Sequence, residues 1–340
     1  MEATTLALWI VVVLILIALA FDFMNGFHDA ANSIATVVST GVLKPHQAVM
    51  VAATFNFAAL FVFQLKVATT VGRGIVDQGI VDHYVVFGAL IGAIAWNIIT
   101  WYYGIPSSSS HALIGGIVGA SVAKAGTWAL IPKGILLVVA FIFVSPLIGF
   151  VIGSMLLVAI SWIFVRSTPS RVDRLFRRLQ LFSSSLYSLG HGGNDAQKTV
   201  GIIWMLLVGA GYVGAAESHP PYWVVAVCYA AIGLGTMFGG WRIVRTMGQR
   251  ITKVRPVGGF CAELSGSVAL FTATALGIPV STTHTIAGAI VGVGSAQNVS
   301  AVRWGIAGNL LWAWILTIPC SAFIAGAAWY LGRMLLAPAH

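Results

Sequence analysis

Two stretches of this sequence are nearly the same, GIPSSSSHALIGGIVG at Gly104–Gly119 and GIPVSTTHTIAGAIVG at Gly277–Gly292, and they decide the fold. They align without gaps and are identical at nine of sixteen positions. Upstream, GFHDA at Gly26–Ala30 aligns with GGNDA at Gly192–Ala196. Both matches keep their order, with a separation of 166 residues for the upstream motif and 173 for the downstream one. A repeat of this kind indicates one structural unit written twice.

The repeat divides the chain into a first half at residues 1–165 and a second half at residues 181–335, joined by a basic linker at residues 166–180. The apolar positions of the linker, Val172, Leu175, Phe176 and Leu179, are typical of a short amphipathic helix on a membrane surface. A solvated basic linker is the alternative.

The composition is that of a membrane protein, because 59% of the residues are hydrophobic and only 8% are charged. Runs such as Leu6–Phe21, Val85–Tyr103, Gly134–Val165 and Tyr222–Gly240 approach or exceed the ~20 apolar residues that cross a bilayer. We therefore expect an all-α polytopic protein of the cell inner (plasma) membrane. The fold prediction is two inverted-topology repeats with about 10–12 transmembrane helices, including two re-entrant helical hairpins.

The net charge of +9 does not indicate a nucleic-acid partner, because the basic residues lie in loops between apolar runs. Two clusters hold ten of the eighteen: Arg166, Arg171, Arg174, Arg177 and Arg178, then Arg242, Arg245, Arg250, Lys253 and Arg255. The positive-inside rule places both clusters in the cytoplasm. The corresponding loop of the first half, Lys66–His83, is not enriched in basic residues, so equivalent loops face opposite sides. This inversion predicts an external loop at Gly209–Pro221 and an external N-terminus.

Four acidic residues fall within apolar segments: Asp22, Asp29, Asp195 and Glu263. A charge at the bilayer centre costs at least ~2.5 kcal/mol on insertion scales, so such residues usually mark an ion or substrate path. The patches around the repeated aspartates, Asn25–Asn32 and His191–Lys198, are rich in Gly and Asn, and we expect them to unwind and offer carbonyl ligands to a cation such as Na+. The alternative is that the carboxylates only cap half-helices or pair with Lys198.

Hydroxyl side chains follow a proline in each half, at Ser107–Ser110 before His111 and at Ser281–Thr283 before His284. Proline ends a helix and hydroxyls cap the next one, and a short apolar run after the cap favours a re-entrant hairpin. A helix N-terminus inside the membrane offers N–H donors and partial positive charge to an oxyanion. Ordinary N-capping is the alternative, and the two histidines either donate to the anion, relay a proton or pack against neighbouring helices.

Cation ligands beside an oxyanion site are the chemistry of a symporter, in which each bound charge lowers the cost of the other. Two other classes are considered. A hydrolase using Ser110 or Thr283 would need a base and an orienting group, and nothing calls for duplicating them. An anion channel needs no buried pair of carboxylates. The sequence thus predicts a transporter, with no enzyme activity and no cofactor.

These motifs resemble the inorganic phosphate transporter (PiT) family, over essentially the whole chain and in the same order. The short linker is similar to that of a compact bacterial member. The resemblance implies a homodimeric symporter of inorganic phosphate with a cation, Na+ or H+, and leaves the coupling ion open because Asn56 stands where sodium-coupled animal members tend to have glutamate. A sulfate or metal–phosphate symporter of the same architecture is the alternative.

The resemblance also implies roles for individual residues. Cation binding and coupling fall to Asn25, Asp29, Asn32, Asn194 and Asp195, with Na+ at the Asp29 and Asp195 sites. Phosphate binding falls to Ser108, Ser109, Ser110, Ser281, Thr282 and Thr283. Supporting roles are expected for Asp22, His111, Gln197, Lys198, Glu263 and His284.

Overall fold

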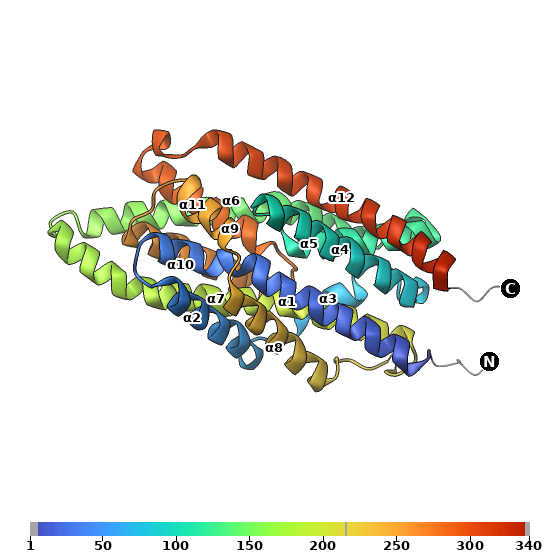
Figure 1. Cartoon of the computed structure of the whole chain (residues 1–340). Helices are drawn as coiled ribbons and strands as arrows, with labels where there is room; N and C mark the ends of the chain where they lie inside the picture. Colours follow the sequence, from blue (N-terminus) through green and yellow to red (C-terminus); the bar gives the residue numbers. More distant parts are fainter. Residues whose placement is uncertain (1–5, 215, 337–340) are drawn as a thin grey trace.

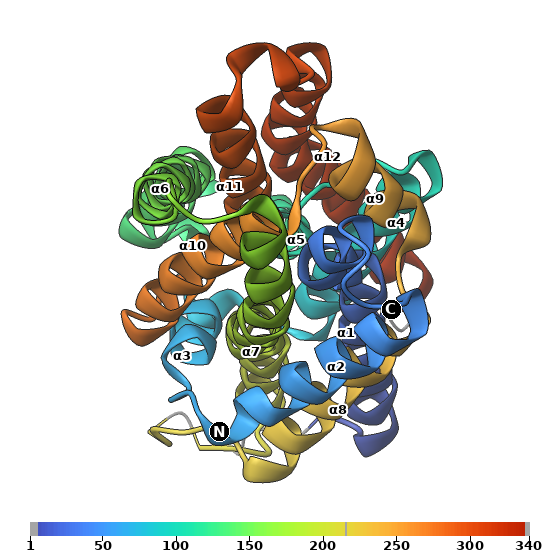
Figure 2. The same cartoon turned by 90° about the vertical axis from the view of Figure 1, so that its left-hand side faces the viewer.

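The computed structural model describes residues 6–214 and 216–336, and within them the protein is built from helices joined by short non-helical segments. In chain order the α-helices are α1 (Leu8–Ser39), α2 (Pro45–Ala58), α3 (Lys66–Arg73), α4 (His83–Tyr103), α5 (Ser109–Ala125), α6 (Pro132–Ile163), α7 (Pro169–Gly209), α8 (Tyr222–Phe238), α9 (Trp241–Arg245), α10 (Pro256–Ala275), α11 (Thr282–Gln297) and α12 (Trp304–Leu336). They form an elongated bundle (Figure 1), and α7 runs through its middle when the bundle is seen from its end (Figure 2).

The order of elements in α1–α6 recurs in α7–α12. A long helix comes first, and then a bent pair, with 82° between α2 and α3 and 61° between α8 and α9. A helix of about twenty residues and a shorter one follow, and each series closes on a long helix with an internal proline, Pro146 in α6 and Pro319 in α12. This order supports the division into two halves, which we propose with a boundary near the start of α7.

The two series interlock, because the short helix of each packs on the last helix of the other. A methyl group at Gly119 in α5 would lie 2.0 Å from the main-chain oxygen of Ala322 in α12. A methyl group at Gly292 in α11 would lie 2.3 Å from the main-chain oxygen of Phe150 in α6. Small residues allow this close approach of helices in a membrane. The α5 and α11 N-termini are thereby held inside a single body.

Within the described residues, five helices are long and apolar enough to cross a membrane: α1, α4, α6, α10 and α12. The number of spans rises to seven if each bent pair counts as one. This confirms an all-helical, multi-pass membrane protein. This number of spans is lower than the 10–12 transmembrane helices expected. The lengths and composition of α5, α11 and α7 explain why these helices are not counted as spans. With 17 and 16 residues, α5 and α11 are about 25 Å long, shorter than the ~30 Å hydrocarbon core. The 41-residue α7 is long enough but carries the polar patch of the site.

The ends of the bundle differ in charge. The basic first turns of α7 lie at one end of the bundle, and the start of α1 and the end of α12 lie at the other (Figure 1). The main-chain N–H of Leu6 donates to the oxygen of Ala210 at 3.3 Å, so α1 begins beside the loop after α7. The predicted external N-terminus and the predicted external loop after α7 therefore lie at the same end of the bundle. Which side of the membrane this end faces stays a prediction.

The separate linker helix expected at residues 166–180 is part of α7. The helix begins at Pro169 and continues without a break to Gly209. Phe176 is buried and packs between Phe164 and Phe260, with ring centroids 5.5 and 5.3 Å away. Phe176 thus anchors the basic segment to the protein, whereas Leu175 stays exposed, and the helix is already formed where the chain enters the bundle.

Candidate functional site

The repeated aspartates lie on the two long helices in the middle of the bundle, Asp29 on α1 and Asp195 on α7. The expectation that the surrounding patches unwind is wrong, because both helices are continuous there. The glycines instead allow close packing. A methyl group at Gly26 would lie 2.1 Å from the main-chain oxygen of Ile232 in α8, and one at Gly192 would lie 2.4 Å from that of Asn56 in α2.

The N-termini of α5 and α11 meet at these aspartates. Each helix follows a non-helical segment that contains the proline, and each has a hydroxyl N-cap. The Ser108 Oγ accepts from the His111 N–H at 3.2 Å, and the Ser281 Oγ accepts from the His284 N–H at 3.1 Å. These two hydroxyls are therefore capping groups. The hydroxyls that reach the aspartates belong to the next residues of each helix.

Asp29 has hydrogen-bonding partners on both carboxylate oxygens. The Oδ1 atom lies 2.6 Å from Nδ1 of His28, and Oδ2 lies 2.6 Å from the hydroxyl of Ser109. The same hydroxyl lies 2.6 Å from Oδ1 of Asn25. The His28 ring continues to the Thr100 hydroxyl on α4, 3.1 Å from Nε2. Asp29 is thus joined to α4 and α5 and is only 2% exposed.

Asp195 is fully buried and has a denser set of partners. Its Oδ1 accepts from the Lys198 ammonium at 2.5 Å and from the Ser110 hydroxyl at 3.3 Å. Its Oδ2 accepts from the Thr282 hydroxyl at 3.1 Å and lies 3.3 Å from Nε2 of His191. The first residue of α11 and the second of α5 therefore converge on one carboxylate.

The contacts of the two aspartates are related by the sequence repeat. Ser109 and Thr282 are equivalent positions of the downstream motif, and each contacts the aspartate of its own half. Ser110 and Thr283 are equivalent as well, and each contacts a residue of the other half. Thr283 accepts from Nδ2 of Asn32 at 2.9 Å, and Ser110 accepts from Nζ of Lys198 at 2.5 Å. The site thus has approximate two-fold symmetry.

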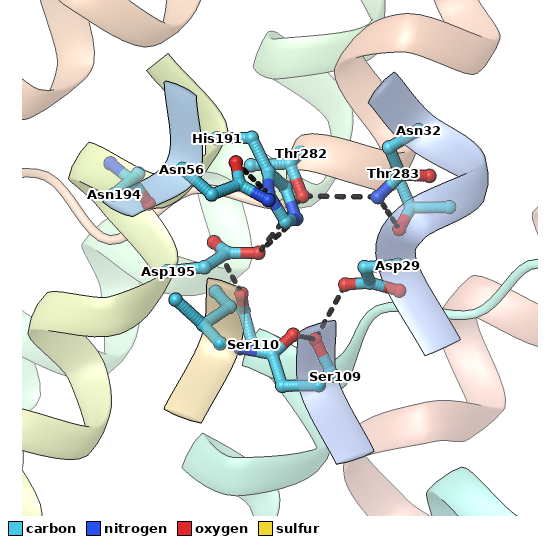
Figure 3. Close-up of polar contacts among 12 residues, drawn as sticks. Asp29, Asn32, Asn56, Ser109, Ser110, His191, Asn194, Asp195, Thr282 and Thr283 are labelled. Carbon is cyan, nitrogen blue, oxygen red and sulfur yellow. Dashed lines mark hydrogen bonds and ion pairs between the residues drawn. The ribbon is translucent and has the colours of Figure 1, made fainter. Parts of the chain in front are cut away.

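The two halves of the site are close together. The hydroxyls and both carboxylates project toward a common centre from α1, α5, α7 and α11 (Figure 3). A carboxylate oxygen of Asp29, one of Asp195 and a ring nitrogen of His191 all lie within 4.8 Å of one another. Two carboxylates at this distance repel each other unless a positive charge lies between or beside them. Oxygen and imidazole ligands at this spacing could hold a cation.

The other predicted residues lie around this centre. Asn25 contacts Ser109, and Asn194 ties α7 to α10 and the segment before α11, with Nδ2 3.0 Å from Oγ1 of Thr274 and 3.2 Å from the oxygen of Ile278. The predicted supporting role of Gln197 is structural, since its Oε1 accepts the N–H groups of Val67 and Ala68 at 3.0 and 3.3 Å at the start of α3.

Three of the predicted supporting residues lie apart from these contacts. Asp22 is buried two turns before Asp29 and joins none of the hydrogen bonds just described. The His111 and His284 rings pack edge to face with centroids 4.7 Å apart, and His284 stacks on Trp314 at 4.1 Å. This arrangement agrees with the packing alternative for the histidines.

Glu263 forms a second polar centre, apart from the aspartates. Its carboxylate accepts from the hydroxyls of Thr36 and Ser183, each at 2.5 Å, and from the amide of Gln180 at 3.0 Å. These partners lie on α1 and α7, and Glu263 itself lies on α10. Three donors satisfy the buried carboxylate and fasten the three helices to one another.

Sequence reasoning left four residues of the site without a role: His28, His191, Asn56 and Thr100. His28 contacts Asp29, and His191 contacts Asp195 with one nitrogen while its Nδ1 lies 3.0 Å from Oδ1 of Asn56. A histidine next to the aspartate, or four residues before it on a helix, is a signal in the sequence. Thr100 on α4 had no such signal, and Asn56 on α2 was noted only as the replacement of a glutamate in sodium-coupled animal members. The tertiary fold brings both residues near the site.

A buried, two-fold related set of carboxylates and hydroxyls inside a multi-pass helical bundle defines a membrane transporter for small ions rather than a hydrolase. Comparison with known proteins agrees with this class. Residues 25–325 match the model of a family described as the phosphate transporter family. The chain belongs to that family.

Relatives match over nearly the full length. A probable low-affinity inorganic phosphate transporter of Rhizobium meliloti (strain 1021) is 60% identical over 326 residues, which cover 96% of this chain and 97% of the relative. One from Bacillus subtilis (strain 168) is 46% identical, with 95% and 97% covered. A solved structure described as the sodium-dependent phosphate transporter has the same fold, with a TM-score of 0.88, 24% identity and coverage of 97% and 100%.

Proposed function

We propose that this protein imports inorganic phosphate across the cell membrane by symport with a cation, Na+ or H+. The observation that carries this proposal is the convergence of hydroxyls from two helix N-termini onto two buried aspartates. Ser109, Ser110 and Thr282 contact the aspartates, and Thr283 contacts the neighbouring Asn32. The curated relatives, described as inorganic phosphate transporters, support the choice of substrate.

The anion would bind between the first turns of α5 and α11. Both N-termini direct partial positive charge and N–H groups toward the centre, and both add hydroxyl donors. Thr283 accepts from Asn32, so its own O–H remains to be donated. A tetrahedral oxyanion with four oxygens suits four hydroxyls that approach from two directions. Sulfate has the same shape, and sulfate or metal–phosphate transport is the alternative.

Cation and phosphate would be coupled through the aspartates. An anion about 5 Å from the Asp29 carboxylate is repelled by about 3 kcal/mol at an effective dielectric constant of about 20. A cation bound at Asp29 cancels this repulsion, so phosphate affinity would rise on the order of 100-fold. By the same physics the cation binds more tightly when phosphate is present. Cation binding at Asp29 and Asp195 is part of the proposal, as is the homodimer that the family resemblance implies.

Transport by purified protein in proteoliposomes tests the proposal. Radiolabelled phosphate should accumulate against its gradient when an inward sodium or proton gradient is imposed, and each gradient applied alone identifies the coupling ion. The Asp29→Asn variant should lose accumulation, because no cation then offsets the phosphate charge. Phosphate flux that does not depend on either cation gradient would indicate a channel instead. Accumulation of sulfate but not phosphate would refute phosphate as the substrate.

A further inference from the structure

The two-fold symmetry of the site has one exception that changes its charge. Asn32 and Lys198 are equivalent positions of the repeat, three residues after Asp29 and Asp195. Each reaches the hydroxyl of the opposite half, Thr283 for Asn32 and Ser110 for Lys198. The first half therefore carries a neutral amide where the second half carries an ammonium group. Such a difference in fixed charge between equivalent positions needs a reason.

The Lys198 ammonium is enclosed by oxygen atoms. It is 1% exposed and donates to Oδ1 of Asp195 at 2.5 Å, to Oγ of Ser110 at 2.5 Å and to the main-chain oxygen of Val280 at 2.7 Å. Three acceptors match the three N–H donors of a charged lysine. A carboxylate, a hydroxyl and a carbonyl freed by non-helical backbone are also the ligand types that hold a coupling cation in transporters of this architecture.

Asp29 has no such partner. No lysine or arginine nitrogen lies within 4 Å of its carboxylate in residues 6–214 and 216–336. Its partners are an imidazole and a hydroxyl. An anionic substrate at the centre thus faces one carboxylate that is already paired with a fixed cation and one that is not.

We propose that the Lys198 ammonium is the resident cation of the second half and replaces the cation from solution that was considered above for Asp195. Phosphate is then coupled to the cation at Asp29 alone. The inference rests on the proposed symport. A tethered cation needs no release and rebinding in each cycle. The transporter would therefore move one cation fewer per phosphate than a fully symmetric site would.

The stoichiometry of transport tests this inference for either coupling ion. In proteoliposomes, the cation gradient that just balances a given phosphate gradient at zero net flux gives the number of cations moved per phosphate. The Lys198→Asn variant copies the residue of the first half, and its ratio should rise by one, because Asp195 then needs a cation from solution. The reciprocal Asn32→Lys variant should lower the ratio by one. Transport by Lys198→Asn at the wild-type ratio would overturn the inference.

Equilibrium binding of radiolabelled sodium to the wild-type protein gives a second, independent answer, which does not require an active variant. At most one sodium ion per chain should bind, and Asp29→Asn should remove it. Two sodium ions per chain, one of which is lost in Asp195→Asn, would refute a resident lysine cation. If the wild-type protein accumulates no phosphate with either gradient, the proposed function is wrong, whereas the sodium count still decides the role of Lys198.

Discussion

The four hydroxyls at the centre differ in whether their O–H group already donates a hydrogen bond, and this decides what each can do for an anion. Ser109 lies 2.6 Å from both Asn25 and Asp29, so its proton is already engaged. Thr282 donates to Asp195, whereas Thr283 only accepts, from Asn32. Thr283 is therefore the hydroxyl best placed to donate to a phosphate oxygen without breaking a contact.

Replacing Thr283 by valine tests this assignment at nearly constant volume. A hydrogen bond to a charged group contributes about 1.5–3 kcal/mol, so the KM for phosphate should rise roughly 10- to 100-fold. Radiolabelled phosphate uptake in proteoliposomes measures it. Thr285→Val is a matched control, because the Thr285 hydroxyl donates only to the main-chain oxygen of Ser281, at 2.8 Å within the same helix. Equal KM values in the two variants would exclude Thr283 as a ligand.

The residues of the site differ in how far the sequence alone predicts them. The hydroxyl caps and the repeated aspartates were predictable, because N-capping is local and a carboxylate in an apolar run needs a function. The contact between Lys198 and Ser110 was not, since it depends on how α5 crosses α7. The unwinding predicted around Gly26 and Gly192 was wrong for a similar reason. In the sequence, a glycine that unwinds a helix cannot be distinguished from one that allows another helix to pack closely.

At the scale of elements, the site depends on how closely the long helices pack. The continuous α1 and α7 carry Asp29 and Asp195, and α8 and α2 approach these helices closely at Gly26 and Gly192. The bends occur instead in the flanking α2–α3 and α8–α9 pairs. The sequence predicted short helices whose N-termini lie at the site, which the structure has as α5 and α11, but it did not locate these bends.

The packing prediction is that Gly192→Ala strongly lowers stability. The added methyl group would lie 2.4 Å from the main-chain oxygen of Asn56, and forced overpacking costs typically about 1–3 kcal/mol, occasionally more. The melting temperature of the purified protein in detergent measures the effect. Gly308→Ala on α12 is the control, because its methyl group would meet nothing within 4 Å. If both variants melted at the wild-type temperature, close packing at Gly192 would not be a constraint.

The hydrogen bonds of Glu263 join α1, α7 and α10, and we expect them to stabilise the folded protein. The change Glu263→Gln keeps the shape but places an NH2 group against a donor of Ser183 or Gln180. A buried polar group that loses its partner costs about 1–3 kcal/mol, so the melting temperature should fall. The exposed Glu217→Gln is the control and should leave it unchanged. A Glu263→Gln variant with normal melting would show that these bonds do not hold α1, α7 and α10 together.

At the scale of the whole molecule, charge is concentrated at the end of the bundle where α7 begins. A cavity of about 590 Å³ opens there, lined by Arg245, Arg250, Lys253 and Arg303 among others. Arg245, Arg250 and Lys253 belong to the basic loop that the positive-inside rule places in the cytoplasm, and Arg303 lies just before α12. Basic side chains around a cavity raise the local concentration of an anion. The cavity is thus suited to attract an anion to this end of the bundle.

Neutralising this cavity should weaken phosphate entry from the cytoplasmic side only. For an Arg250→Gln/Arg303→Gln double variant, the KM for phosphate at that side should rise by roughly tenfold at low ionic strength, because electrostatic focusing raises local anion concentration by about 10-fold or more. The difference should shrink as salt shortens the Debye length. Uptake into inside-out and right-side-out vesicles separates the two sides. An Arg171→Gln/Arg174→Gln variant removes the same charge from the exposed start of α7 and should leave both KM values unchanged. Equal effects of the two double variants would show that net charge, and not the cavity, attracts phosphate.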